Sequence, residues 1–216
     1  MSPTAEETLI EAITAYDYPP VTYDFLEQRE RCFAGVRDLE RYLQGLLWAT
    51  DTQSIRNGLS GVLYWGHYRV GYRDDRVRNF RARVTETRLL RAIRTFRVLH
   101  GSGIVDLCKI DLPQFSYMAF VTKLRTFLDP ERYCVLDSKI ASLAPLAARL
   151  KRQKTYIPVT AQNNRAYEWW IDTCLSLALR LQNQHDCRPV DVERGLFYLC
   201  DRGKLGVAEH LLSNVT

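Results

Sequence analysis

The sequence lacks long apolar runs, and it nearly lacks sustained alternation of apolar and polar residues. No apolar run approaches the ~18 residues that a membrane-spanning helix needs. The N-terminal residues 1–13 are acidic and do not show the basic-then-apolar order of a secretory signal. These absences favour a cytoplasmic protein that has no contact with a membrane. The scarcity of period-two alternation argues against a β-sheet fold.

The cysteines lack the spacings of a metal or redox site. The six cysteines include no C-x-x-C pair, and no histidine lies near one of them at zinc-finger intervals. Free cysteines are commonly buried as small apolar residues. We therefore expect reduced structural thiols, no metal and no cofactor, with a metal or disulfide role as the alternative.

Helical periodicity dominates the rest of the chain. Apolar residues recur at helical spacing in six segments, namely 36–50, 55–64, 77–96, 117–128, 167–181 and 190–200. This pattern predicts an all-α protein. Gly101 and Gly103 mark the clearest break, which gives an N-terminal helical region 1–103 and a second region 104–216. One compact two-lobed domain is the alternative.

Arginine is concentrated in one stretch that contains no lysine. Ten arginines and three acids lie between Arg69 and Arg97, which gives a net charge of +7 over 29 residues. A charge run is usually a solvated helix face, but the planar fork and permanent charge of guanidinium suit phosphate. The stretch therefore favours contact with nucleic acid. Lys151 and Arg152 belong to a second, smaller basic cluster.

Residues 112–143 contain an ordered series of structural signals. A tight turn is predicted at Leu112-Pro113-Gln114-Phe115-Ser116. A helix should follow this turn and end at Asp129-Pro130. Leu136-Asp137-Ser138-Lys139-Ile140 then predicts a second helix that begins at Asp137. This order, with 24 residues from Pro113 to Asp137, resembles the helix–hairpin–helix DNA glycosylase superfamily.

Two further segments narrow the resemblance. The segment FLDPERYCVLDSKIA, and the segment RPVDVERGLF that follows a Tyr-x-x-Trp helix, are similar to the 8-oxoguanine-glycosylase-like branch of prokaryotes. Some members of that branch are implicated in defence against phages that carry modified DNA bases. The resemblance is concentrated in residues 104–200, and the first hundred residues fit only in their helical character.

The resemblance implies helical lobes around a central cleft and a monomeric enzyme acting on double-stranded DNA. Such an enzyme flips out a modified base and cleaves its N-glycosidic bond, which leaves an abasic site in DNA repair or in phage defence. Asp137 matches the catalytic acid of the family, whose carboxylate stabilises the cationic sugar and orients the attacking water. Taken in isolation, Asp137 is better interpreted as a helix cap worth ~1 kcal/mol. The turn, the spacing, the proline break and the arginines together favour the catalytic interpretation.

Two departures from the family pattern bear on mechanism. Gln114 and Ser116 occupy hairpin positions that glycine usually holds, where positive φ and close approach of backbone amides to a phosphate are needed. Met118 stands where bifunctional members carry a Schiff-base lysine, and a thioether cannot form an imine. We therefore expect a monofunctional enzyme, with Lys123 and Lys139 as candidates for a displaced lysine.

The candidate contacts with DNA form two groups. A flipped base needs stacking and edge hydrogen bonds, although any one aromatic residue can instead pack helices together. The base-pocket candidates are Trp65, His67, Tyr68, Tyr72 and Trp169. The candidates for contact with the DNA backbone are Gln114, Ser116, Tyr117, Arg69, Arg73, Arg76, Arg78, Lys151 and Arg152.

Two other functions compete with a glycosylase. One is a non-catalytic DNA-binding module on the same scaffold, which the altered hairpin glycines favour. The other is a helical protein whose arginines bind an acidic protein partner. The excised base also stays open, because oxidised purines, alkylated bases, uracil-like lesions and modified cytosines are separated by the shape of the pocket rather than by the fold.

Overall fold

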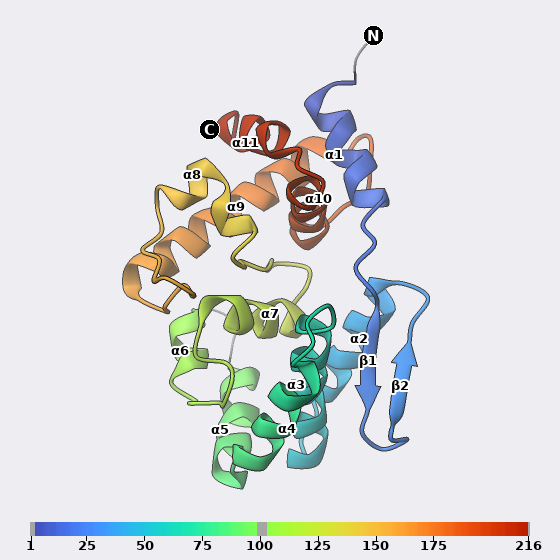
Figure 1. The fold of residues 1–216 in the computed structure, drawn as a ribbon, viewed down its shortest axis with the longest axis vertical. Helices are drawn as coiled ribbons and strands as arrows, with labels where there is room; N and C mark the ends of the chain where they lie inside the picture. The colour runs from blue at the N-terminus through green and yellow to red at the C-terminus, as the bar shows by residue number, and fades with distance from the viewer. Residues whose placement is uncertain (1–2, 99–102, 216) are drawn as a thin grey trace. The chain divides into compact units, whose positions relative to one another are not determined.

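The computed structural model describes residues 3–98 and 103–215 and is mostly helical (Figure 1). The chain forms two compact units, one of residues 18–129 and the other of residues 1–17 together with 130–216. Of the two glycines that mark the predicted break between regions 1–103 and 104–216, Gly101 lies outside the described residues. The two compact units divide after Asp17 and after Asp129, so both ends of the chain belong to the same unit.

The unit of residues 18–129 combines a β-hairpin with helices. Its described elements are β1 (Val21–Asp24), β2 (Arg29–Cys32), α2 (Val36–Leu47), α3 (Thr52–Gly66), α4 (Arg73–Arg83), α5 (Glu86–Arg97), α6 (Ile104–Cys108) and α7 (Met118–Leu128). The predicted helices within residues 36–64 and 117–128 are confirmed, because their apolar stripes are long enough to specify a buried face.

Helix α3 is the central element of this unit. It packs against α2, α4, α5, α7 and β1, and all its residues from Asn57 to Trp65 are buried. The Asp51 carboxylate caps its first turn by accepting a hydrogen bond from the Ser54 amide at 2.8 Å. A Cβ added to Gly61 would lie 2.5 Å from Leu43 Cδ2, so a glycine is required where α2 crosses closely.

The β-hairpin corrects the all-α prediction. β1 and β2 pair antiparallel, from Val21 opposite Cys32 to Asp24 opposite Arg29. β1 is largely buried and packs on α3, whereas β2 is exposed. Each strand has only four residues, so its alternation is too short to stand out in the sequence.

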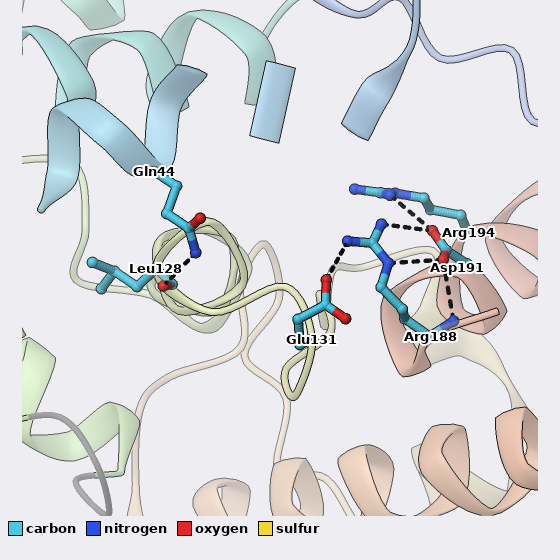
Figure 2. Close-up of polar contacts among 6 residues, drawn as sticks. All are labelled: Gln44, Leu128, Glu131, Arg188, Asp191 and Arg194. Atoms are coloured by element: carbon cyan, nitrogen blue, oxygen red, sulfur yellow. Dashed lines mark hydrogen bonds and ion pairs between the residues drawn. The ribbon is translucent and has the colours of Figure 1, made fainter. Parts of the chain in front are cut away.

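Side chains at the end of α2 donate hydrogen bonds to the last carbonyl of α7. Leu128 is the last residue of α7, and the Asp129-Pro130 break predicted from the sequence is confirmed. The Leu128 carbonyl accepts hydrogen bonds from Gln44 Nε2 at 3.1 Å (Figure 2) and from Trp48 Nε1 at 3.0 Å. These bonds replace the intrahelical partners that a terminal carbonyl lacks.

The second unit is built around α10. Its described elements are α1 (Ala5–Thr14), the 3₁₀ helix η1 (Ile140–Ser142), α8 (Ala144–Ala147), α9 (Ala161–Leu181), α10 (Pro189–Asp201) and α11 (Leu205–Ser213). Helix α10 packs against α1, α9, α11 and η1. Gly195 allows the approach of α1, because a Cβ there would lie 2.7 Å from Ile13 Cγ1 and 2.8 Å from Leu9 Cδ1.

The helix predicted to begin at Asp137 is not continuous. A turn at residues 138–139 leads into η1 and then into the single turn of α8. Pro145 has no N–H to donate to the Ala141 carbonyl, so an α-helix cannot run through this segment. Among the helices of the described ranges, none has the length and the apolar character needed to cross a membrane.

The packing around Gly61 can be tested against a second glycine. We expect Gly61→Val to lower the free energy of unfolding by about 1–3 kcal/mol, because the new side chain overlaps Leu43 and Thr22. Gly45→Ala is the control, since a Cβ at Gly45 has nothing within 4 Å and alanine should raise stability by about 0.5–1 kcal/mol. Urea unfolding measures both, and equal effects at the two sites would contradict this account of α3.

Candidate nucleic-acid interface

The turn before α7 keeps its geometry without glycine. The Phe115 amide donates to the Leu112 carbonyl at 3.1 Å, and Gln114 adopts a φ of +71°. With Pro113 at the second position, this is the pattern of a type II turn, whose third position needs positive φ. Gln114 therefore adopts the positive-φ conformation for which glycine was expected at this position. Because glutamine has a Cβ atom, this conformation strains the backbone locally.

Arginines of α4 and α5 hold the segment that contains this turn. Arg76 Nη1 donates to Gln114 Oε1 at 3.1 Å, and Arg88 forms an ion pair with Asp111, which also has a positive φ of 60°. Arg91 Nη1 reaches the Lys109 carbonyl at 3.4 Å. Part of the arginine stretch thus stabilises the turn.

The first turn of α7 is suited to an anion. Ser116 and Tyr117 are exposed, and Tyr117 caps the helix without a side-chain hydrogen bond. The first amides of a helix lack intrahelical acceptors and carry the positive end of its dipole. Met118, at the next position, is fully buried and belongs to the core of this unit.

Like Arg76, the other three arginines proposed to contact the DNA backbone have protein partners. Arg73 lies 3.9 Å from the ring centroid of Tyr64 and bonds Glu30 at 3.2 Å. The guanidinium of Arg69 lies over a tyrosine ring, and Arg78 pairs with an aspartate one turn away on α4. These contacts fix the arginine side chains along the surface.

Exposed arginines further along the stretch are additional candidates that the sequence analysis did not single out. Arg83, Arg94 and Arg97 are exposed and have no hydrogen-bond or ion-pair partner among residues 3–98 and 103–215. Arg94 and Arg97 alternate along α5 with the buried Ile93 and Phe96. Each follows directly after an apolar residue of the helical stripe, so the sequence pattern could have placed both arginines on the exposed face of α5.

The aromatic candidates separate into a surface group and a core group. His67 stacks on Phe120 with a centroid distance of 4.3 Å, and the exposed Tyr72 meets His67 edge-on at 5.6 Å. Burial, followed by the charges of Lys123 and Arg76, lowers the pKa of His67 to about 4. His67 is therefore neutral near pH 7, and Phe120 is a member of this group that the sequence analysis missed.

Trp65 and Tyr68 lie deeper than the sequence pattern suggests. Trp65 is buried, with its ring edge-on to Phe127 at 5.1 Å and to Tyr18 at the same distance. Tyr68 is half-buried beneath the guanidinium of Arg73. This placement favours a packing role for Trp65, which was the alternative interpretation of the aromatic loop.

In the other unit, Asp137 stands at the end of a segment without regular secondary structure that α9 anchors. Tyr167 Oη donates to the Cys134 carbonyl and Trp170 Nε1 to the Val135 carbonyl, both at 2.9 Å. The two residues of the Tyr-x-x-Trp pattern thus fix the backbone that leads to Asp137. The half-buried Asp137 carboxylate accepts hydrogen bonds through Oδ1 from two backbone amides, those of Lys139 at 2.9 Å and Ile140 at 3.1 Å.

Other charged groups surround the Asp137 turn. Lys139 forms an ion pair with Asp201 of α10, and its Nζ lies 4.8 Å from the centroid of the Phe197 ring. Burial raises the pKa of the Cys200 thiol to about 11, and the Asp137 charge contributes to that rise. The turn at Asp137 thus interacts with the C-terminal part of α10. Lys139 does so through its ion pair with Asp201 and its contact with Phe197, and Asp137 through the effect of its charge on Cys200.

The second basic cluster lies beside the same turn. Arg152 Nη1 is 3.5 Å from the Ala141 carbonyl, at the position where Pro145 interrupts the helix. Lys151 is exposed, and Asn163 of α9 holds its backbone through two hydrogen bonds of 2.8 Å. The structure thus brings Lys151 and Arg152 into the neighbourhood of η1.

Trp169 has a place distinct from that of its neighbour. Trp170 is fully buried, whereas Trp169 is half-buried with the Arg149 guanidinium 4.1 Å from its ring centroid. Of the two adjacent tryptophans, Trp169 therefore stays the one accessible for stacking.

The RPVDVERGLF segment forms an internal ionic network at the start of α10 (Figure 2). The buried Asp191 carboxylate accepts hydrogen bonds from Arg188 Nε at 2.9 Å and from Arg194 Nη1 at 3.3 Å. Arg188 also bonds Glu131 at 3.0 Å. Burial alone would raise the pKa of Asp191, but the Arg188 hydrogen bonds and the charges of Arg194 and Arg188 hold it well below its usual range. This network ties the chain after Pro130 to α10.

The cysteines are free thiols. Cys134 and Cys174 are buried in one unit, and burial raises the pKa of both thiols. Within the described ranges, no group of three histidine, cysteine, aspartate or glutamate side chains is arranged to hold a metal ion.

The candidate site residues thus belong to two separate sets. The hairpin turn, the arginine stretch, the aromatic group and Lys123 lie in the unit of residues 18–129. The other unit holds Asp137, Lys139, Lys151, Arg152 and Trp169. Comparison of the chain with protein-family models, with curated proteins and with solved structures gives no match.

At most positions alanine gives a more stable protein than glycine, but the positive φ at Gln114 predicts the reverse order there. We expect Gln114→Gly to be more stable than Gln114→Ala by about 1 kcal/mol, because both variants lose the Arg76 hydrogen bond and only glycine accepts positive φ without strain. The same pair of substitutions at the exposed Ser116, whose φ is not positive, should give the opposite order. Chemical denaturation measures all four variants, and an alanine preference at both positions would show that the turn is unstrained.

Proposed function

We propose that this protein is a monofunctional DNA N-glycosylase that acts as a monomer on double-stranded DNA and removes a modified base. The proposal joins the sequence resemblance to two structural features. One is a basic unit with a type II turn leading into a helix N-terminus. The other is a carboxylate fixed at the end of an anchored segment.

The fixed position of the Asp137 carboxylate is the observation that carries the proposal. Departure of a base leaves an oxocarbenium-like sugar, and a carboxylate held beside it stabilises that charge without reorganising during the reaction. Two backbone amides bind one oxygen of Asp137, and Tyr167 and Trp170 restrain the segment before it. The same carboxylate can orient and deprotonate the water that attacks C1′ of the sugar.

The unit of residues 18–129 supports binding to the DNA backbone. It has 18 lysine and arginine residues against 12 acids, a net charge of +6, whereas the other unit has 12 against 13. Positive charge of this kind provides the sequence-independent part of DNA affinity. The amides at the start of α7 offer hydrogen bonds to a phosphate oxygen. The stacked His67 and Phe120, together with Tyr72, offer aromatic faces to an unstacked base.

The structure supports water as the attacking nucleophile better than a lysine that forms an imine with the sugar. Met118 occupies the family position, and Lys139 is paired with Asp201. Lys123 is largely buried and its Nζ lies 3.4 Å from the Ala119 carbonyl, on its own helix. These placements favour direct hydrolysis and an abasic product.

Asp137→Asn tests the acid without removing its structural role. The asparagine Oδ1 can accept the same two amide hydrogen bonds, so folding and DNA affinity should stay close to those of the wild type. Base release should fall by at least about 100-fold, because the charge that stabilises the transition state is lost. Mass spectrometry of free bases released from genomic and phage DNAs measures release and identifies the base.

The matched control is Asp172→Asn on the exposed face of α9, which removes the same charge from the same unit. It should leave base release unchanged. Near-normal release by Asp137→Asn from DNA that the wild type processes would remove Asp137 from the mechanism.

Borohydride trapping tests the monofunctional assignment. We expect no covalent enzyme–DNA adduct, because hydrolysis passes through no imine. Gel analysis after reduction in the presence of substrate DNA measures the adduct. Efficient trapping that disappears in Lys123→Gln or in Lys139→Gln would identify a displaced lysine and a lyase step.

A non-catalytic DNA-binding module is the second candidate. The retained turn geometry at Gln114 and the basic unit support DNA binding without requiring catalysis. Under this alternative the wild type binds duplex DNA with strong salt dependence but releases no base from any modified DNA.

A further inference from the structure

Two arginines, Arg56 of α3 and Arg81 of α4, repel each other and have no carboxylate partner among the described residues. Arg81 of α4 donates through Nη1 to Asn57 Oδ1 at 3.0 Å and to Ser60 Oγ at 3.1 Å, and its guanidinium carbon lies 4.2 Å from the Phe25 ring centroid. Arg56 of α3 is the residue before Asn57 and interacts electrostatically with Arg81. Neither arginine forms an ion pair with any of the described residues.

Hydrogen-bond donors exceed acceptors around these arginines. Asn57 Oδ1 already accepts from Gln53 Nε2 at 3.1 Å as well as from Arg81, and Ser60 donates its own proton to the Arg56 carbonyl at 2.7 Å. Arg56 Nε is buried and has no partner in the described ranges. An N–H left in this state is unfavourable, because it has lost its hydrogen bond to water without gaining an acceptor in the protein.

The charges of the two arginines are not offset locally. Burial, followed by the charge of Arg56, lowers the pKa of the Arg81 guanidinium. Glu86 is bound to Thr52, one turn before Arg56 on α3, and it pairs with neither arginine. An oxyanion bound by the accessible N–H groups of both guanidiniums would offset their mutual repulsion.

We propose that Arg56, Asn57 and Arg81 form a binding site for a phosphate group. Guanidinium forks match the geometry of phosphate oxygens, and the asparagine Nδ2, which has no acceptor among the described residues, adds a neutral donor. The phosphate belongs either to the DNA backbone or to a small phosphate-bearing molecule. The proposal does not depend on base excision, because it concerns only binding.

The first experiment measures thermal unfolding of the full chain with inorganic phosphate against chloride at equal ionic strength and pH. At about ten times its dissociation constant, phosphate should raise Tm of the wild type by roughly 3–6 °C. Arg56→Gln should lose most of this shift. Arg29→Gln is the control, because it removes an exposed arginine of β2 from the same unit and should keep the shift.

The direction of the Tm change in chloride separates binding from packing. Arg56→Gln removes a like charge and a buried donor without a partner, so Tm in chloride should rise or stay constant. A lower Tm of this variant in chloride, with an unchanged response to phosphate, would overturn the proposal and make Arg56 a structural residue. Arg81→Lys keeps the charge but loses the fork, and it should weaken the phosphate response without abolishing folding.

The second experiment identifies the source of the phosphate. Binding of an unmodified DNA duplex is measured over a range of salt concentrations, where each phosphate contact contributes about 0.9 to the slope of log K against log salt. A smaller slope for Arg56→Gln than for Arg29→Gln assigns the site to the DNA backbone. Equal slopes, together with a phosphate response that requires Arg56, assign it to a small phosphate-bearing ligand. Equal slopes and equal phosphate responses in the two variants would refute the site.

Discussion

Buried backbone carbonyls need hydrogen-bond donors, and this requirement determines where Asp137 stands. Residues 134–136 are buried and belong to no helix or strand, so their carbonyls need donors other than those of a regular element. Helix α9 supplies the donors through Tyr167 and Trp170, each at 2.9 Å. The chain then turns at Asp137, whose carboxylate binds the amides of the turn itself. The position of the acid is therefore a consequence of how α9 satisfies the segment before it.

The arginines of the basic unit have more than one role. Arg76 and Arg88 stabilise a turn that contains two residues with positive φ, and Arg73 is held between an aromatic ring and acids. Arg56 and Arg81 instead leave their charge unbalanced inside the unit. The net positive charge is thus divided between residues that build the surface and residues that remain able to bind an anion.

The helices were the most predictable part of this protein. The stripes of α2, α3 and α7 were visible because helical periodicity over eleven or more residues is a local signal. The β-hairpin was missed because its strands have four residues each. The helix expected after Asp137 was wrong because the effect of Pro145, eight residues downstream, was not taken into account. Asp137 and the turn at Gln114 were both singled out from the sequence. The hydrogen bonds that hold them, from Tyr167 and Trp170 to the segment before Asp137 and from Arg76 to Gln114, were not predicted.

The sequence by itself determined the helical segments, the proline break after α7 and the concentration of arginine. Each of these depends on residues within a few turns of one another. Only the tertiary structure decided which arginines have partners, because those partners are distant in the chain: Asn57 for Arg81, Asp111 for Arg88 and Glu30 for Arg73. It also decided that Trp65 is buried while Tyr72 is exposed, although both belong to one short aromatic stretch. Periodicity reports which face of a helix is apolar, whereas burial and pairing depend on what the rest of the chain places against that face.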